Sequence, residues 1–168
     1  MVKRRGGGVK IGDNCEIYPS VNFGSEPYLI SLGNHVRINS GVQLITHDGG
    51  VWVLREYLDI LGHEKIDLFG QIKIGNNVHI GTNAIIMPNV IIGNNCIIGC
   101  GAIVTKNIPD NSIVVGVPAR VIKSIDEYAK QHMKDFEYTK HMSKNEKKEC
   151  LSKKFINKGG ADKNLDLI

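Results

Sequence analysis

IGNNVHIGTNAIIMPNVIIGNNCIIGCGAIV, residues 74–104, is the stretch that decides the fold of this chain. Every sixth residue counted from Ile74 is aliphatic: Ile80, Ile86, Ile92, Ile98 and Val104. Every sixth residue counted from Val78 is small or aliphatic: Ala84, Val90, Cys96, Ala102 and Ile108. A period of six fits neither a helix nor a set of hairpins and is typical of a solenoid. We therefore expect each unit to form one short strand and one corner, so that three units close a triangular coil.

The same period occurs in an earlier block of the chain. It runs through Ile11, Ile17 and Phe23 and resumes, after a short insertion, as Leu32, Ile38 and Leu44. The corners between these residues are rich in glycine and asparagine, which tolerate the left-handed backbone of a tight turn. Residues 9–122, without the interruption at 47–71, supply about five coils, a stack of about 24 Å. The sequence predicts an all-β fold, a parallel β-helix.

Composition and charge narrow the choice of partners. The chain has 168 residues and a net charge of +4, and 10 of its 21 basic residues lie beyond Ser124. Acidic residues are interleaved with them and no aromatic platform accompanies them, so we expect a charged helical tail and no nucleic-acid partner. We find no long apolar run and no signal peptide, and expect a cytoplasmic protein without a membrane span. The four cysteines are expected to be free thiols.

The chain is expected to have three parts. Residues 1–8 form a flexible lead-in, residues 9–122 the β-helix domain, and residues 123–168 a C-terminal helix and charged tail. The excursion at 47–71 interrupts the repeat, and its apolar content, including the single tryptophan, indicates that it packs on something.

The spacing of Ser124 and Glu127 is that of a capping box, which predicts that a helix begins after Ser124. We expect this helix to cover the open end of the solenoid with one face: Ile125, Tyr128, Ala129, His132 and Phe136. Beyond about residue 143 the composition gives no secondary-structure prediction and indicates fraying.

Two stretches resemble the hexapeptide-repeat acyltransferases, in the branch of the galactoside and maltose O-acetyltransferases and the enzymes that acetylate bacterial surface polysaccharides. One runs from Ile74-Gly75-Asn76-Asn77-Val78-His79-Ile80-Gly81 to Ile98-Gly99-Cys100-Gly101. The other is Ile103-Val104-Thr105-Lys106-Asn107-Ile108-Pro109 followed by Val117-Pro118-Ala119-Arg120-Val121-Ile122. The resemblance covers residues 9–123, and the bare repeat by itself fixes fold rather than chemistry.

The resemblance implies a left-handed β-helix, an exception to the usual right-handed parallel crossover. It also implies a homotrimer with active sites in the clefts between subunits and with the long loop reaching across a neighbour. The cosubstrate it implies is acetyl-CoA, without a metal.

His47 matches the catalytic histidine of the family, whose imidazole takes the proton from the acceptor hydroxyl. Thr82 matches the residue whose backbone amide meets the oxyanion; an ordinary corner residue is the alternative. Asp48 either orients His47 or contacts the substrate, or is an exposed turn aspartate. Asn22 matches a family asparagine that contacts the sugar acceptor, and a solvated corner amide is the alternative.

For the coenzyme, Cys100, Thr105 and Lys106 match positions that contact the pantetheine arm and the phosphates. Arg120 and Lys123 match basic residues near the adenosine phosphates, where cationic side chains suit a polyanion. Each of these has a solvated surface residue as its alternative, and Cys100 departs from the usual alanine.

The other histidines are not predicted to act, and His35 and His79 are expected at exposed corners. No two histidines are spaced to share one site across coils, so no zinc site of the γ-carbonic anhydrase kind is expected. We expect an acetyl-CoA-dependent O-acetyltransferase that transfers directly to a sugar or glycan-precursor hydroxyl. The run from His47 to Trp52 resembles the polysaccharide-modifying members. Two alternatives stay open: N-acetylation of an amino sugar, and a non-catalytic trimeric scaffold that binds a partner through its lysine-rich tail.

Overall fold

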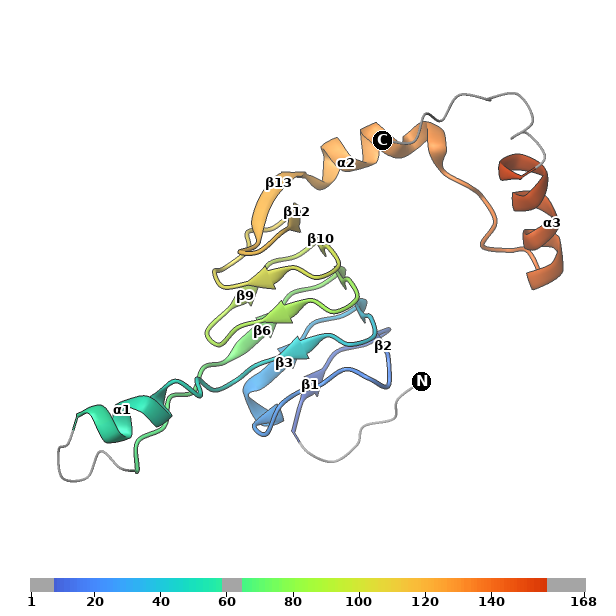
Figure 1. Cartoon of the computed structure of the whole chain (residues 1–168). Coiled ribbons are helices and arrows are strands. Elements are labelled where there is room, and N and C mark those ends of the chain that lie inside the picture. The colour runs from blue at the N-terminus through green and yellow to red at the C-terminus, as the bar shows by residue number, and fades with distance from the viewer. Residues whose placement is uncertain (1–7, 59–64, 157–168) are drawn as a thin grey trace. The chain divides into compact units, whose positions relative to one another are not determined.

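The computed structural model describes residues 8–58 and 65–156. Contacts divide the chain into two units, Met1–Gln131 and His132–Ile168. The first unit holds a stack of short strands, from which one helix, α1 (Val51–Tyr57), projects (Figure 1). Apart from Gly8, the predicted lead-in lies outside the described residues.

Three sheets form the sides of the stack. Sheet A contains β1 (Lys10–Ile11), β3 (Ile30–Leu32), β6 (Ile72–Ile74) and β9 (Ile91–Ile92). Sheet B contains β2 (Glu16–Ile17), β4 (Val36–Ile38), β7 (Val78–Ile80), β10 (Cys96–Ile98), β12 (Ser112–Val115) and β13 (Arg120–Ser124). Sheet C contains β5 (Gln43–Leu44), β8 (Ile85–Ile86) and β11 (Ile103–Val104). The chain visits A, B and C in turn, and the strands are parallel except β13, which confirms the predicted left-handed parallel β-helix.

Coil length follows from the register of the strands. Residues one coil apart differ by 18 in the middle of the stack, as Asn76 and Asn94 do. They differ by 21 in the first coil, as Asp13 and Asn34 do, because the segment 24–29, which contains a 3-10 turn, η1 (Pro27–Leu29), makes this coil three residues longer (21 − 18).

The inward positions of the repeat form one continuous core. Those in the phase of Ile74 are at most 4% exposed: Ile74, Ile80, Ile86, Ile92, Ile98 and Val104. Those in the phase of Val78 are at most 6% exposed: Val78, Ala84, Val90, Cys96, Ala102 and Ile108. Strand pairing places Ile38, Ile80 and Ile98 directly above one another. Because like side chains stack at the strand spacing, the core is filled by the repeat itself.

Corner AB, between sheets A and B, is held by a ladder of side-chain hydrogen bonds. Amide oxygens accept from the backbone one coil below: Asn34 Oδ1 from Asp13 N, Asn76 Oδ1 from Asn34 N, and Asn94 Oδ1 from Asn76 N, all within 2.9 Å. Asp110 Oδ1 ends the ladder by accepting from Asn94 N at 2.8 Å. The third residue of each such corner has a left-handed φ near +55°: Asn14, His35, Asn77, Asn95 and Asn111. This explains the recurrence of asparagine.

The C-terminal end of the solenoid is closed by a strand. β13 pairs antiparallel with β12, and the buried Ala119 joins the core cluster. Helix α2 (Ile125–His132) begins where the capping box predicts, since Ser124 Oγ accepts from Glu127 N at 3.1 Å and Ser124 N donates to Glu127 Oε2 at 2.6 Å. However, α2 has no buried residue, so the expectation that it covers the core is wrong.

Two residues lie elsewhere than we predicted from the sequence. Phe136 follows the 3-10 turn η3 (Met133–Asp135) and is not on α2. His79 lies in the middle of β7, between Arg37 and Ile97, and not at a corner. Burial of the imidazole lowers its pKa, and the positive charge of Arg37 lowers that pKa further.

The second unit contains α3 (Lys144–Phe155), in a segment for which we made no secondary-structure prediction and expected fraying. It starts with a complete capping box between Ser143 and Glu146, the same spacing that predicted α2. Lys154 forms an ion pair with Glu137. In the described part of the chain, no helix is both long and apolar enough to cross a membrane.

Candidate active site

The excursion at 47–71, which we call the arm, leaves the solenoid at corner CA, between sheets C and A. Its two ends pair antiparallel: Asp48 N donates to Leu68 O at 2.8 Å, Gly70 N donates to Thr46 O at 2.7 Å, and His47 bridges Phe69. His47 therefore lies at the base of the arm, between two backbone hydrogen bonds that join the outgoing leg to the returning leg.

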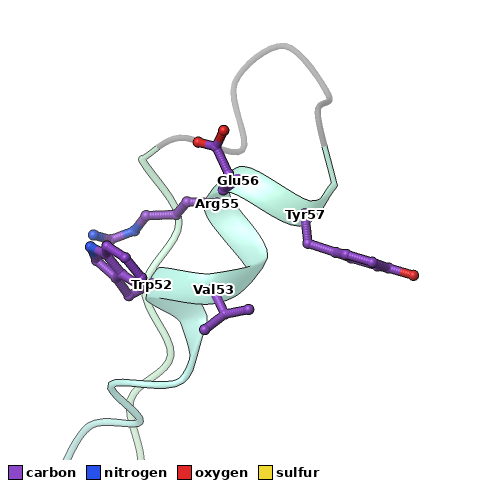
Figure 2. A pocket seen from close by; sticks show the side chains of 5 residues that line it. All are labelled: Trp52, Val53, Arg55, Glu56 and Tyr57. Carbon is purple, nitrogen blue, oxygen red and sulfur yellow. The ribbon is translucent and has the colours of Figure 1, made fainter.

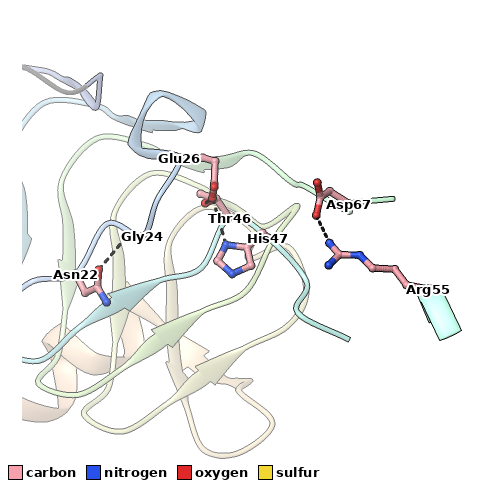
Figure 3. A network of polar contacts seen from close by, with 7 residues as sticks. All are labelled: Asn22, Gly24, Glu26, Thr46, His47, Arg55 and Asp67. Carbon is pink, nitrogen blue, oxygen red and sulfur yellow. Dashed lines mark hydrogen bonds and ion pairs between the residues drawn. The ribbon is translucent and has the colours of Figure 1, made fainter. Parts of the chain in front are cut away.

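A second set of contacts ties the arm together further out. Arg55 Nη2 forms an ion pair with Asp67 Oδ1 at 2.6 Å (Figure 3). The Nε of the same side chain donates to Ile66 O at 3.0 Å. Because α1 carries Arg55, the guanidinium links this helix to the returning leg of the arm.

The His47 imidazole contacts a carboxylate that the sequence reading did not select. Its Nδ1 lies 3.2 Å from Glu26 Oε2, while the side chain as a whole is 46% exposed. In Figure 3 the second ring nitrogen faces away from Glu26. The ring is thus held on one edge and open on the other, the arrangement a general base needs.

Glu26 belongs to the insertion in the first coil and is only 15% exposed. Its Oε2 also accepts from Thr46 Oγ1 at 2.9 Å, and Thr46 is fully buried. The pKa of Glu26 is lowered, most strongly by a hydrogen bond from the Ser25 side chain. Hydrogen bonds from Thr46 and His47 lower it further, while burial of the carboxylate acts in the opposite direction. The carboxylate is therefore ionised and can accept a hydrogen bond from His47.

The Asp48 carboxylate forms neither a hydrogen bond nor an ion pair with the His47 imidazole. Its Oδ1 accepts from Gly50 N at 2.8 Å, in the turn that leads into α1. A signal for Glu26 was present in the sequence: it precedes His47 by 21 residues, which is also the offset between paired strands of the first two coils. Reading that offset requires knowing where the insertion falls, because residues 24–29 lie outside the six-residue count.

Thr82 and Cys100 lie at corner BC, between sheets B and C. Both follow a strand of sheet B and precede a strand of sheet C. In the described part of the chain, the backbone N–H groups of Ser40, Thr82 and Cys100 donate to no protein acceptor. Register aligns these residues on successive coils, about 4.8 Å apart, as a column of free amide donors.

The remaining predicted residues are spread over two regions. Asn22 pairs with Gln43 just before corner CA, and its Oδ1 accepts from Gly24 N at 2.9 Å. The residue is exposed. Thr105 and Lys106 are exposed at corner CA, two coils above the arm.

Arg120 and Lys123 lie on β13 at the end of the stack. Arg120 donates to its neighbour Ala119 O at 2.8 Å, and Lys123 contacts Gln131. One chain thus places His47 in contact with Glu26 at corner CA, with Asn22 just before that corner, and keeps Thr82 and Cys100 at corner BC.

Comparison with known proteins assigns the chain to a family. Residues 71–106 match the family model described as bacterial transferase hexapeptide (six repeats). The chain is 51% identical over 151 residues to Protein CapG of Staphylococcus aureus, a match that covers 88% of this chain and 84% of CapG. The chain belongs to the hexapeptide-repeat acetyltransferase family.

Two solved structures of such acetyltransferases are similar to it. One is VCA0836 from Vibrio cholerae, with a TM-score of 0.60 and 27% identity over 70% of this chain and 62% of that one. The other is VCA0836 complexed with acetyl coenzyme A, with a TM-score of 0.57 and 27% identity over 71% of this chain and 61% of that one. In both cases the matched part is under two thirds of the relative. The resemblance seen in the sequence is confirmed, and the protein is a hexapeptide-family acetyltransferase.

The outer surface of the arm of this acetyltransferase is apolar and exposed. Trp52 is 73%, Val53 58% and Tyr57 78% exposed. Together with Arg55 and Glu56 they line a pocket of about 550 Å³. Figure 2 shows the five side chains on and beside α1. The apolar content of the arm predicted that it packs on something, and within the described residues of its own chain these three side chains stay largely uncovered.

Proposed function

We propose that the protein is an acetyl-CoA-dependent O-acetyltransferase that modifies a hydroxyl of a sugar or glycan precursor. The observation that carries this proposal is the His47 imidazole, whose Nδ1 edge meets an ionised carboxylate and whose other edge is open. A positioned base of this kind contributes typically about 10²–10⁴-fold to the rate. The sugar as acceptor rests on the resemblance of the run from His47 to Trp52 to polysaccharide-modifying enzymes.

In the proposed reaction, Nε2 of His47 removes the proton from the acceptor hydroxyl as its oxygen attacks the thioester carbonyl carbon. The carbonyl oxygen gains the electron pair and accepts a hydrogen bond from the free Thr82 amide, a contact worth on the order of 10²–10³ in rate. The carbon–sulfur bond then breaks, and the imidazolium returns the proton to the leaving thiolate. The acetyl group passes directly to oxygen, and no acetyl-enzyme forms.

The column of free amides at corner BC suits the coenzyme. The pantetheine arm carries amide carbonyls along its length, and Cys100 N is a donor one coil above Thr82 N. Thr105 and Lys106 at corner CA, with Arg120 and Lys123 on β13, are the proposed contacts for the phosphates. The related acetyltransferase VCA0836 has been solved in complex with acetyl coenzyme A, which supports the same cosubstrate here.

We further propose that the active site forms between chains of a homotrimer. Sheet C separates His47 from Thr82, because residues 82–87 cross it with an extended length of about 17 Å. The hydroxyl held by His47 has to attack the carbonyl held by the Thr82 amide, so both groups must face the same reacting atoms, and we propose that they are contributed by different chains. The apolar surface of the arm, with Trp52 and Tyr57, is the proposed contact with the neighbour.

Mixing two inactive variants tests the shared site. His47→Ala lacks the base, and Thr82→Pro lacks the amide hydrogen without losing a protein hydrogen bond. If each cleft takes His47 from one chain and Thr82 from the next, random co-assembly restores about a quarter of the clefts. Activity that stays absent in co-refolded mixtures, while both variants keep the wild-type size and melting temperature, contradicts the proposal.

The acceptor is tested by incubating the protein with acetyl-CoA and a panel of sugars and nucleotide sugars. The assay measures coenzyme release and the acetyl mass gain of the acceptor. We expect His47→Ala to lower turnover by about 10²–10⁴-fold, and His141→Ala, an exposed histidine of the second unit, to leave it unchanged. Wild-type protein that neither binds coenzyme A nor hydrolyses acetyl-CoA supports the scaffold instead. A product stable to mild base identifies an N-acetylated amino sugar.

A further inference from the structure

We infer that Glu26 is the positioning residue of the proposed catalytic base, fixing the tautomer and the ring orientation of His47. This inference rests on the proposed function and deepens it, because it names the group that makes one imidazole nitrogen the base. It assigns a role to the insertion at 24–29, which the six-residue repeat does not require.

The contact geometry comes from two coils. Glu26 lies one coil below His47, and the strand pairing between Asn22 and Gln43 carries this register up to the corner. Thr46 is held by its backbone bond to Gly70 and turns its hydroxyl to Glu26 Oε2 at 2.9 Å. The same carboxylate oxygen lies 3.2 Å from His47 Nδ1. The oxygen that contacts the imidazole is therefore fixed by a buried residue and is not a free surface side chain.

The ionised carboxylate determines which ring nitrogen is protonated. A carboxylate oxygen only accepts, so Nδ1 must carry the hydrogen and Nε2 keeps its lone pair. When Nε2 takes the acceptor proton, the ring becomes positive beside this carboxylate, and the charge-assisted hydrogen bond strengthens. Glu26 thus acts on the reaction through His47 and touches neither substrate.

The nearby carboxylates have other partners. Asp48 Oδ1 accepts from Gly50 N, and Asp67 Oδ1 pairs with Arg55. Among the described residues, Glu26 is the carboxylate within hydrogen-bond distance of His47.

The experiment compares Glu26→Gln and Glu26→Ala with wild type by histidine ¹⁵N NMR and by kinetics. Wild type should show His47 with hydrogen on Nδ1. Glu26→Gln keeps an acceptor oxygen but loses the charge, so the Nδ1–H signature of His47 should weaken. Glu26→Ala loses both the oxygen and the charge, so His47 should become a mixture of the two tautomers. We expect kcat to fall about 10-fold for Gln and about 10²-fold for Ala, with the KM for acetyl-CoA unchanged. The control Glu16→Gln removes a carboxylate that pairs with Arg37 on sheet B and should change neither readout.

Thr46→Val provides a second variant if Glu26→Ala does not fold. It removes the hydroxyl that holds Glu26 at nearly constant volume and should reduce both the tautomer preference and kcat. A wild-type tautomer and kcat in these variants overturn the inference. If wild-type protein has the Nδ1–H signature but no turnover with any acceptor, the proposed function fails and the role of Glu26 in orienting the ring stands.

Discussion

Gly81→Ala tests whether the close approach of successive coils aligns the amides at corner BC. A Cβ at residue 81 would lie 2.6 Å from Cys100 N, 2.8 Å from Gly99 C and 2.9 Å from Ile98 O. All three are backbone atoms of the next coil, which is tied to residue 81 by the bond from Gly81 N to Ile98 O at 2.8 Å. No flexible side chain can move away, so the coils must separate.

Overpacking costs typically about 1–3 kcal/mol, and contact with backbone alone places this substitution at about 3 kcal/mol. For a chain of this size, the melting temperature should fall by about 6–12 °C. Since Cys100 N is the nearest atom and Thr82 follows directly, binding of coenzyme A should weaken as well.

Thermal unfolding and coenzyme titration measure the two effects. Gly49→Ala is the matched control for stability, because a Cβ there meets nothing within 4 Å. The reasoning is that contact between successive coils aligns the free amides of corner BC. A Gly81→Ala protein with the same melting temperature as Gly49→Ala and the coenzyme A affinity of wild type would refute it.

Three further predictions concern the core, the end of the corner ladder and the thiols. Ile80→Ala, at a fully buried position between Ile38 and Ile98, should lower the free energy of unfolding by about 4 kcal/mol. Urea unfolding measures this decrease in the free energy of unfolding, and a decrease under about 1 kcal/mol contradicts tight stacking of the core side chains. Hydrogen bonds from the Asn94 backbone and side chain lower the pKa of Asp110 below 3.8, so the stability from its charge is present above that pH and lost as the pH falls through the lowered value. The melting-temperature difference between wild type and Asp110→Asn should therefore shrink below pH 3.8, and a pH-independent difference disproves this assignment. Iodoacetamide should label the exposed Cys100 and spare Cys96, whose pKa is raised by burial. Acetyl-CoA should protect Cys100 from this labelling. Mass spectrometry that finds Cys96 modified first refutes the assignment of Cys96 as buried.

The fold could be predicted from the sequence because the solenoid is built from a local rule. Each six-residue unit specifies its own strand and corner, and the next coil repeats the same pattern, so the period from Ile74 to Val104 is enough to predict the stacked core. The capping box before Ile125 worked for the same reason, since Ser124 and Glu127 interact within one turn. Applied to Ser143 and Glu146, the same rule would have predicted α3.

The surroundings of the proposed site were less accessible. His47 could be selected because it stands where the repeat breaks. Its partner could not, because Glu26 reaches it from another coil through an insertion whose path the repeat does not describe. The adjacent Asp48 was considered as the orienting group, yet on extended backbone neighbouring side chains point in different directions, and Asp48 bonds to Gly50 instead.

The sequence alone determined the triangular stack, its inward residues, and the corner where the arm leaves. Only the tertiary structure decided that His47 contacts Glu26 and that sheet C separates His47 from Thr82. It also decided that the two legs of the arm are joined by backbone hydrogen bonds and by the ion pair of Arg55 with Asp67. The physical reason is the range of the interactions: periodic burial and helix caps act between residues close in sequence. Contacts across coils depend instead on insertions that change the register, and these become visible only when the chain is folded.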